Sequence, residues 1–203
     1  MNIISHNSSK KDIENYYLAK SFTESELANS IDGHVFIVTP YNKEKIIKHV
    51  VSDKHKITKA LIFYETGYDP ITNTKQGHWC CMFFRYPNIY FFDSLGLFPD
   101  DQLNKIPMSY RTKSNQVERR LGKIFYALTQ KGYKIHYNDK KYQEEKNDVA
   151  TCGRFCRLFL TECIDDNVDP YIKMKRILKF YKVKGEKFYD NAIVRHDKVV
   201  YGE

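Results

Sequence analysis

The stretch that decides the fold is GHWCCMFFRYPNIYFFDSLG, residues 77–96. It contains two apolar runs, 78–85 and 88–93, which only Tyr86 and Pro87 separate. Two such runs joined by a short turn predict an antiparallel hairpin. Apolar residues on both faces of the hairpin predict that it lies inside a covered sheet. We therefore expect a sheet with further layers packed on it.

The segments on either side of this hairpin predict further strands and several helices. Strands are expected over 34–39, 60–64 and 134–137, and helices after the capping residue Thr23, over 43–59, over 115–130, from Cys152 onward and over 170–181. Turn-forming residues predict a loop over 67–77, and 182–203 is expected to be irregular. Because strands come mostly in the first two thirds of the chain and helices flank them, the pattern favours the α+β class.

Length and composition limit the class of protein. The chain has 203 residues, of which 42% are hydrophobic and 15% aromatic, and this predicts one compact domain over 1–203 with 1–20 as a loosely attached lead-in. The longest apolar run has six residues, 79–84, and the N-terminus has no apolar stretch of signal-peptide length, so neither a membrane span nor secretion is expected. Five cysteines, two of them adjacent, predict reduced thiols in an intracellular setting.

Three residues at predicted element ends carry side chains suited to nucleophilic chemistry. Cys152 stands where a polar loop gives way to a helix, and a helix N-terminus favours the thiolate. His78 at a strand start can act as general base. Asp93 follows the paired strand, so it can lie across the hairpin from His78 and orient the imidazole. Gly153 would let the backbone turn tightly next to the thiol.

Each of these residues taken alone is more often structural than catalytic. A cysteine at a helix start is commonly a small core residue, and Asp before Ser-Leu-Gly is a turn former. Their joint occurrence at element ends, where reactive groups are normally displayed, favours the catalytic interpretation. A structural zinc site needs paired ligands, and only Cys152 and Cys156 have suitable spacing, so no metal is expected. The remaining thiols, Cys80, Cys81, Cys156 and Cys163, are expected to be inert in the core.

The segments GHWCCMFF, NIYFFDSLGLFPDD and NDVATCGRFCRLFL together resemble the adenain-type viral cysteine proteases, with SUMO-specific proteases as more distant relatives. The resemblance extends from about residue 77 to 160 and rests on the order His, acid, Cys. It implies a permuted papain-like fold with a central mixed sheet flanked by helices. It also implies amide hydrolysis through an acyl-enzyme at Cys152, with His78 as base and then acid, and Asp93 as orienting carboxylate.

Proteases of this type also use a glutamine shortly before the nucleophile to donate a hydrogen bond to the oxyanion. The approach loop of this chain has one glutamine, Gln143, somewhat farther from Cys152 than the family pattern. Glu145 lies nearer the expected spacing, but its carboxylate would repel a developing oxyanion. The resemblance therefore assigns the role to Gln143, with Asn147 as the fallback.

The resemblance further implies a virus-encoded enzyme that cleaves capsid and other precursor proteins during virion maturation. Such an enzyme would act in the virion and in the host cell cytoplasm, where the virus assembles. It would need no metal or small-molecule cofactor, although relatives are activated by viral DNA or by a peptide. The net charge of +8 and the basic stretches 43–59 and 171–187 are compatible with sequence-independent DNA binding, although basic helix faces are more often simply solvated.

Two alternatives remain open at the level of sequence. The same triad serves isopeptidases that remove SUMO or ubiquitin from conjugates. The chain can also be a catalytically silent, basic binding protein of the virion, for which replacing Cys152 would change nothing. No membrane partner is expected in either case.

Overall fold

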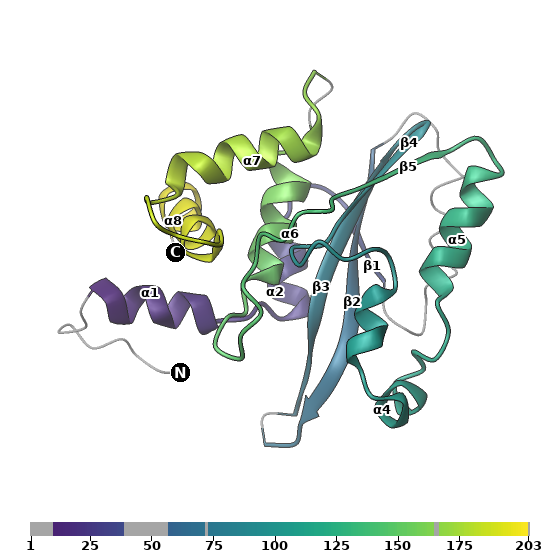
Figure 1. Cartoon of the computed structure of the whole chain (residues 1–203), viewed down its shortest axis with the longest axis horizontal. Helices are drawn as coiled ribbons and strands as arrows, with labels where there is room; N and C mark the ends of the chain where they lie inside the picture. The colour runs from purple at the N-terminus through teal and green to yellow at the C-terminus, as the bar shows by residue number, and fades with distance from the viewer. Residues whose placement is uncertain (1–9, 39–56, 72, 165–166, 203) are drawn as a thin grey trace.

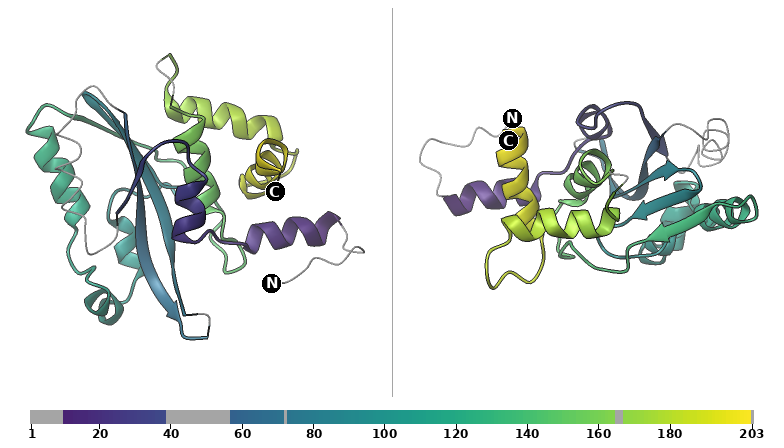
Figure 2. Two further views of the ribbon diagram at one scale, coloured as in Figure 1. Left: turned by 180° about the vertical axis from the view of Figure 1, so that it is seen from behind. Right: turned by 90° about the horizontal axis from the view of Figure 1, so that it is seen from above.

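The computed structural model describes residues 10–38, 57–71, 73–164 and 167–202, and within them a five-stranded sheet is covered by helices on both faces (Figures 1 and 2). In spatial order the strands are β1 (Val35–Val38), β2 (Thr58–Asp69), β3 (Thr74–Arg85), β4 (Asn88–Phe92) and β5 (Lys134–Tyr137). β1 is parallel to β2 and β5 to β4, whereas the central pairs are antiparallel. The α+β class and the mixed sheet flanked by helices are thereby confirmed.

The helices of the described residues are α1 (Lys10–Ala19), α2 (Glu24–Asn29), the 3-10 helix η1 (Asp101–Lys105), α4 (Met108–Lys113), α5 (Arg120–Thr129), α6 (Cys152–Thr161), α7 (Pro170–Tyr181) and α8 (Asp190–Tyr201). The expected start at Thr23 is confirmed, because Glu26 N–H donates to Thr23 Oγ1 and Thr23 N–H donates to the Glu26 carboxylate. The predicted helices from Cys152 and over 170–181 are confirmed as α6 and α7. In the described part of the chain, no helix has the length and apolar character to cross a membrane.

The β3–β4 hairpin forms the middle of the molecule, as its sequence predicts. Arg85 pairs with Asn88 across the Tyr86–Pro87 turn. Because side chains alternate along a strand, Cys81 packs in the core on the α6 side and Cys80 in the core on the α5 side. α7 and α8 lie outside α6, whereas α5 lies on the opposite side of the sheet (Figure 2). Both faces of the hairpin are therefore buried.

The antiparallel pairing of β2 with β3 extends farther than the sequence predicts. A loop was expected over 67–77, and this prediction is wrong because residues 67–69 and 74–77 are paired strand. A register shift between Glu65 and Gly67 marks a bulge in the ribbon. Main-chain hydrogen bonds do not require apolar side chains, so the polar residues here continue the ladder beyond the sheet (Figure 1).

Two predictions about helices need correction. The helix expected over 115–130 is shorter, because α5 begins after Val117, whose side chain is 45% exposed rather than part of the apolar face. The segment 182–203, expected to be irregular, contains α8. Buried charged residues, His196 and Asp197, interrupt the apolar spacing of α8 and so conceal it in the sequence.

The N-terminal third also differs from expectation. The described part of the lead-in expected over 1–20 contains α1, which contacts α8, and the Leu18 carbonyl accepts a hydrogen bond of 2.7 Å from Ala150 N–H. Most of the helix expected over 43–59 cannot be compared, because residues 43–56 lie outside the described part of the chain. Its last two residues, 58 and 59, belong to β2.

Buried charges join α6 to α8, and we call them the α6–α8 charge cluster. Arg154 and Arg157 each place a guanidinium nitrogen at 2.7 and 2.6 Å, respectively, from Asp197 Oδ2. The other carboxylate oxygen of Asp197 lies 3.2 Å from His196 Nδ1, and His196 Nε2 lies 2.9 Å from Glu162 Oε1. Because a buried charge is tolerated only when it is paired, this cluster specifies how α8 docks on α6.

Candidate active site

His78 and Asp93 face each other where β4 ends. The last β3–β4 pair is Cys81 with Phe92, so His78 lies on β3 beyond the end of β4 and next to the following turn. Its Nε2 lies 2.9 Å from Asp93 Oδ1, and both side chains are buried. Burial alone would lower the pKa of His78, but the adjacent Asp93 carboxylate outweighs it and the pKa is well above its usual value. The site therefore favours the imidazolium.

The carboxylate of Asp93 is fixed by the turn that it starts. Its Oδ1 also accepts a 2.7 Å hydrogen bond from Leu95 N–H, and Gly96 N–H donates to its carbonyl. Asn138, just after β5, accepts from Asp93 N–H at 2.9 Å and donates to Asp93 O at 2.7 Å. Asp93 is thus both a turn former and the histidine partner. Asn138 belongs to no sequence motif, and sequence reasoning missed it.

Cys152 is the first residue of α6, and its side chain meets His78. Because Nε2 of His78 faces Asp93, Nδ1 is the ring nitrogen left for the thiol. Burial would raise the pKa of Cys152, but the hydrogen bond and charge of His78 outweigh this, helped by the backbone N–H groups of Trp79 and Gly153. The pKa of the thiol is lowered, so the pair favours thiolate and imidazolium.

The other four cysteines have thiols of the opposite character. All five thiols of the chain are free and buried. Burial raises the pKa of Cys80, Cys81, Cys156 and Cys163. The Cys156 thiol, one helical turn from Cys152, faces the Trp79 carbonyl at 3.5 Å. Only Cys152 combines a helix N-terminus with a histidine, and it is the one thiol with a lowered pKa.

Two glycines let the elements of the site approach each other. A Cβ on Gly77, the residue before His78, would lie 2.4 Å from the Phe63 ring and from the Tyr64 carbonyl. A Cβ on Gly153 would lie 2.9 Å from the Phe22 ring. Gly153 was expected to allow a tight turn, but it lies within α6, so close packing against Phe22 is its structural reason.

Gln143 lies buried in the loop before Cys152. Its Oε1 accepts a 2.7 Å hydrogen bond from Ser94 Oγ, and its Nε2 donates to Val149 O at 3.3 Å. Gln143 N–H also donates to the Ser94 carbonyl. These contacts tie the loop to the residue after Asp93. The donation of the second Nε2 hydrogen to an oxyanion stays a prediction, and the fallback residue, Asn147, is exposed.

Asp190, the first residue of α8, holds both ends of the segment that precedes Cys152. Its two carboxylate oxygens accept hydrogen bonds from Thr151 Oγ1 and from Glu144 N–H. Burial raises the pKa of Asp190 to about 6, and these two hydrogen bonds partly counter the rise. No sequence pattern points to this role of Asp190, because 182–203 was expected to be irregular.

The donor atoms of His78, Cys80 and Asp93 lie within 4.8 Å of one another, as a metal site would require. Burial, however, keeps the pKa of Cys80 well above its usual value, so this thiol stays protonated. Nε2 of His78 and Oδ1 of Asp93 already bond each other. Cys81 packs on the opposite side of the sheet from Cys80 and adds no ligand. The set does not fit a four-ligand structural zinc site.

Comparisons with known proteins give one relative at the level of sequence. No family model matches the chain. An uncharacterized protein of the Sputnik virophage, V9, is 46% identical over 85 residues, which make up 41% of this chain and 47% of that protein. The chain thus matches about half the length of this curated relative. A relative of the chain is therefore a viral protein.

Two solved structures are similar in outline. The central domain of the uncharacterized Lpg1148 protein of Legionella pneumophila has a TM-score of 0.47 and 10% identity, covering 91% of this chain and 99% of that one. ChlaDub1 of Chlamydia trachomatis has a TM-score of 0.39 and 13% identity, covering 96% of this chain and 78% of that one. Both likenesses are too weak to assign a fold or an activity.

Proposed function

We propose that this chain is an adenain-type cysteine endopeptidase of permuted papain-like fold, which cleaves capsid and other precursor proteins during virion maturation. The observation that carries the proposal is geometric: Cys152 begins α6 beside His78, whose Nε2 lies 2.9 Å from the buried Asp93 carboxylate. The lowered pKa of Cys152 agrees with this arrangement. A thiol with these neighbours is suited to nucleophilic attack on a carbonyl. The virophage relative supports the viral setting.

In the proposed reaction the Cys152 thiolate attacks the scissile carbonyl, and the C–N bond breaks to leave a thioester. His78 gives its proton to the departing amine. The neutral imidazole then takes a proton from a water molecule that attacks the thioester, which regenerates thiolate and imidazolium. Asp93 keeps Nε2 engaged and so leaves Nδ1 for the thiol.

The oxyanion of the tetrahedral intermediate would be stabilised by Gln143 and by backbone N–H groups at the start of α6. Gln143 is held in place by Ser94 and Val149, so its remaining hydrogen has a fixed direction. Removing a donor of this kind typically slows the reaction on the order of a hundredfold.

The setting of the activity is part of the same proposal. The enzyme would work in the virion and in the host cytoplasm during assembly, without a metal or small-molecule cofactor. The basic residues of α7 are compatible with sequence-independent contact with viral DNA.

The first test is alkylation with iodoacetamide at limiting concentration, read by peptide mass spectrometry. We expect fast modification of Cys152 alone near neutral pH, because it is the thiol with the lowered pKa. The His78→Ala variant should lose this selectivity, and Cys156→Ala, which removes a nearby thiol, should keep it. Slow, scattered labelling that ignores His78 would contradict the proposed nucleophile and leave the silent binding protein.

The second test separates an endopeptidase from an isopeptidase. Wild type and Cys152→Ala are incubated with a proteome-derived peptide library, and new N-termini are identified. Internal cleavage that disappears with Cys152→Ala supports the endopeptidase. Cleavage confined to SUMO or ubiquitin fusions, supplied in a parallel reaction, would favour the isopeptidase.

A further inference from the structure

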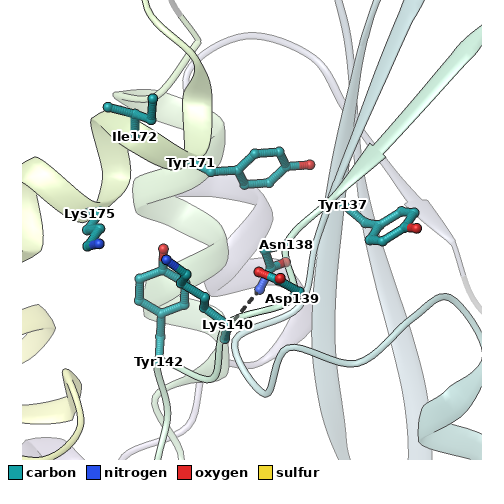
Figure 3. Close-up of a pocket in the computed structure, with 8 residues that line it drawn as sticks. All are labelled: Tyr137, Asn138, Asp139, Lys140, Tyr142, Tyr171, Ile172 and Lys175. Carbon is teal, nitrogen blue, oxygen red and sulfur yellow. Dashed lines mark hydrogen bonds between the residues drawn. The ribbon is translucent and has the colours of Figure 1, made fainter.

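A cavity of about 250 Å³ lies between α7 and the segment that follows β5 (Figure 3). The α7 side contributes Tyr171, Ile172 and Lys175. The opposite side is formed by residues 137–140 and Tyr142. No side chain of the candidate triad lines this cavity, so it is separate from the site described above.

The aromatic part of the wall is held rigidly by the core. Tyr171 donates its hydroxyl hydrogen to the Phe91 carbonyl at 2.8 Å, and its ring stacks on Phe159 with centroids 5.5 Å apart. Tyr142 is buried, and its ring contacts that of Tyr189 with centroids 5.4 Å apart. The tyrosine surface is therefore formed before any ligand arrives, which lowers the entropic cost of binding.

The floor of the loop side is fixed as well. Asn138 Nδ2 donates to the Lys140 carbonyl at 3.0 Å (Figure 3) and to the Asp93 carbonyl at 2.7 Å. These two hydrogen bonds hold the backbone of Lys140 in one position. The side chain of Lys140 therefore extends into the cavity from a backbone position that does not move.

Two ammonium groups approach each other at this cavity from opposite sides. Lys140 comes from the loop and Lys175 from α7, and they lie close enough for their side chains to interact directly. The nearby charge of Lys140, followed by that of Lys179, lowers the pKa of Lys175. Within the described part of the chain, neither Lys140 nor Lys175 forms an ion pair. An anion between the two would remove this repulsion.

We propose that this cavity binds a phosphate monoester. The phosphate would lie between the ammonium groups of Lys140 and Lys175, and the organic group would pack on Tyr142 and Tyr171. Lysine binds phosphate as a point charge, and a phosphate monoester carries nearly two negative charges at neutral pH. The cavity is several times the roughly 30 Å³ that a water molecule occupies, so a phosphate with a ring-sized group fits.

One lining residue opposes an anion, and it provides a further test. The Asp139 carboxylate also lines the cavity, where it partly offsets the two lysines. Asp139→Asn should therefore tighten binding of the phosphate. If the cavity instead bound a cation through the Asp139 carboxylate, Asp139→Asn would weaken binding of that cation. The direction of the change in affinity therefore distinguishes an anion site from a cation site.

The test is a titration of the full chain with phenyl phosphate, followed by amide chemical shifts. We expect saturable binding that weakens about tenfold or more in Lys140→Met and in Lys175→Met, since each loses a charge-assisted hydrogen bond. Arg176→Met is the matched control, because it removes an exposed positive charge of the same helix that does not line the cavity. Inorganic phosphate should bind more weakly than phenyl phosphate, because it makes no contact with the tyrosines.

Three results would overturn the proposal. One is the absence of saturable binding, and another is an equal loss in Arg176→Met, which would indicate non-specific attraction to a basic helix. The third is a tighter complex with phenol than with phenyl phosphate, which would show that the charge is not recognised. The titration does not depend on Cys152, so its outcome is independent of the proposed protease activity.

Discussion

Two buried histidines of this molecule each contact an aspartate, but their third partners differ. His78 bonds Asp93 at the end of β4, and its ring also interacts with the Cys152 thiol. His196 bonds Asp197 within α8, and its remaining nitrogen lies 2.9 Å from the Glu162 carboxylate. Burial lowers the pKa of His196, but Asp197 and Glu162 more than compensate and raise it to about 9.

A buried His–Asp pair is therefore not by itself a reactive site. In the α6–α8 charge cluster each charge has a fixed partner of opposite sign, including Arg154 and Arg157 on Asp197. No group there gains or loses a proton to react. At His78 the third partner is a thiol whose lowered pKa favours the thiolate, which can attack a carbonyl. The proposed nucleophilic chemistry at His78 therefore depends on Cys152. The α6–α8 charge cluster instead serves to pair buried charges.

We expect the greatest loss of stability when the α6–α8 charge cluster loses its shared carboxylate. Asp197→Ala leaves Arg154 and Arg157 buried without their shared carboxylate, which typically costs about 3–5 kcal/mol in the free energy of unfolding. Urea denaturation followed by circular dichroism measures this loss. Replacing both arginines by methionine together with Asp197→Ala should recover most of it, and an equally unstable triple variant would contradict this account.

The second prediction concerns the reactivity of Cys152 when His78 is removed. His78→Ala removes the group that lowers the pKa of Cys152, so burial then raises that pKa. Because each pKa unit changes the thiolate fraction tenfold, we expect alkylation at neutral pH to slow by about a hundredfold or more. The matched variant is His196→Ala, which should lower stability but leave alkylation of the folded protein nearly unchanged. Equal slowing of alkylation in both variants would contradict a specific role of His78 in activating Cys152.

A smaller effect appears in the pH dependence of stability. The folded pKa of His196, about 9, lies above the ordinary value of 6.5. The contribution of protonated His196 to the free energy of unfolding is therefore fully present below pH 6.5 and is lost as the pH rises through 9. Allowing for solvent screening, we expect the free energy of unfolding to fall by roughly 1–2 kcal/mol over this range. The fall should shrink in His196→Gln. A wild-type and a variant curve of the same slope would contradict the prediction.

The smallest expected changes in stability come from removing one of two hydroxyl groups, that of Tyr201 or that of Ser94. Tyr201→Phe removes a hydrogen bond of 3.1 Å to Glu162, and Ser94→Ala removes one of 2.7 Å to Gln143. Each should cost about 1 kcal/mol of stability, the usual contribution of such a bond. Only Ser94→Ala loosens the loop before Cys152, so it alone should change the rate of peptide cleavage. A change in cleavage with Tyr201→Phe would count against this reasoning.

The sequence predicted what local patterns encode. The β3–β4 hairpin, the capping box at Thr23 and the helix that begins at Cys152 follow from apolar spacing and turn residues. The candidate triad followed from three residues at element ends, and the structure brings the side chains of His78, Asp93 and Cys152 together. Their catalytic roles remain predictions.

Contacts between residues far apart in the chain could not be predicted from local sequence patterns. Asn138 bonds the Asp93 backbone and Asp190 bonds Thr151, but neither stands in a motif that announces its partner. α8 escaped detection because buried His196 and Asp197 look like surface residues in a sequence. The length of the β2–β3 ribbon escaped because backbone pairing is independent of side-chain polarity.

The hydrogen bond from Thr151 to Asp190 also sets an order of events during biosynthesis. His78, Asp93 and Cys152 are all synthesised before Asp190, at a pace of roughly 5–20 residues per second. Until α8 has been made, the loop before Cys152 lacks the carboxylate that holds its two ends. A nascent chain of this length therefore contains His78, Asp93 and Cys152 but not the contacts of Asp190 with the loop. If the proposed activity needs this loop held in place, the order of residues along the chain delays that activity until α8 has been synthesised.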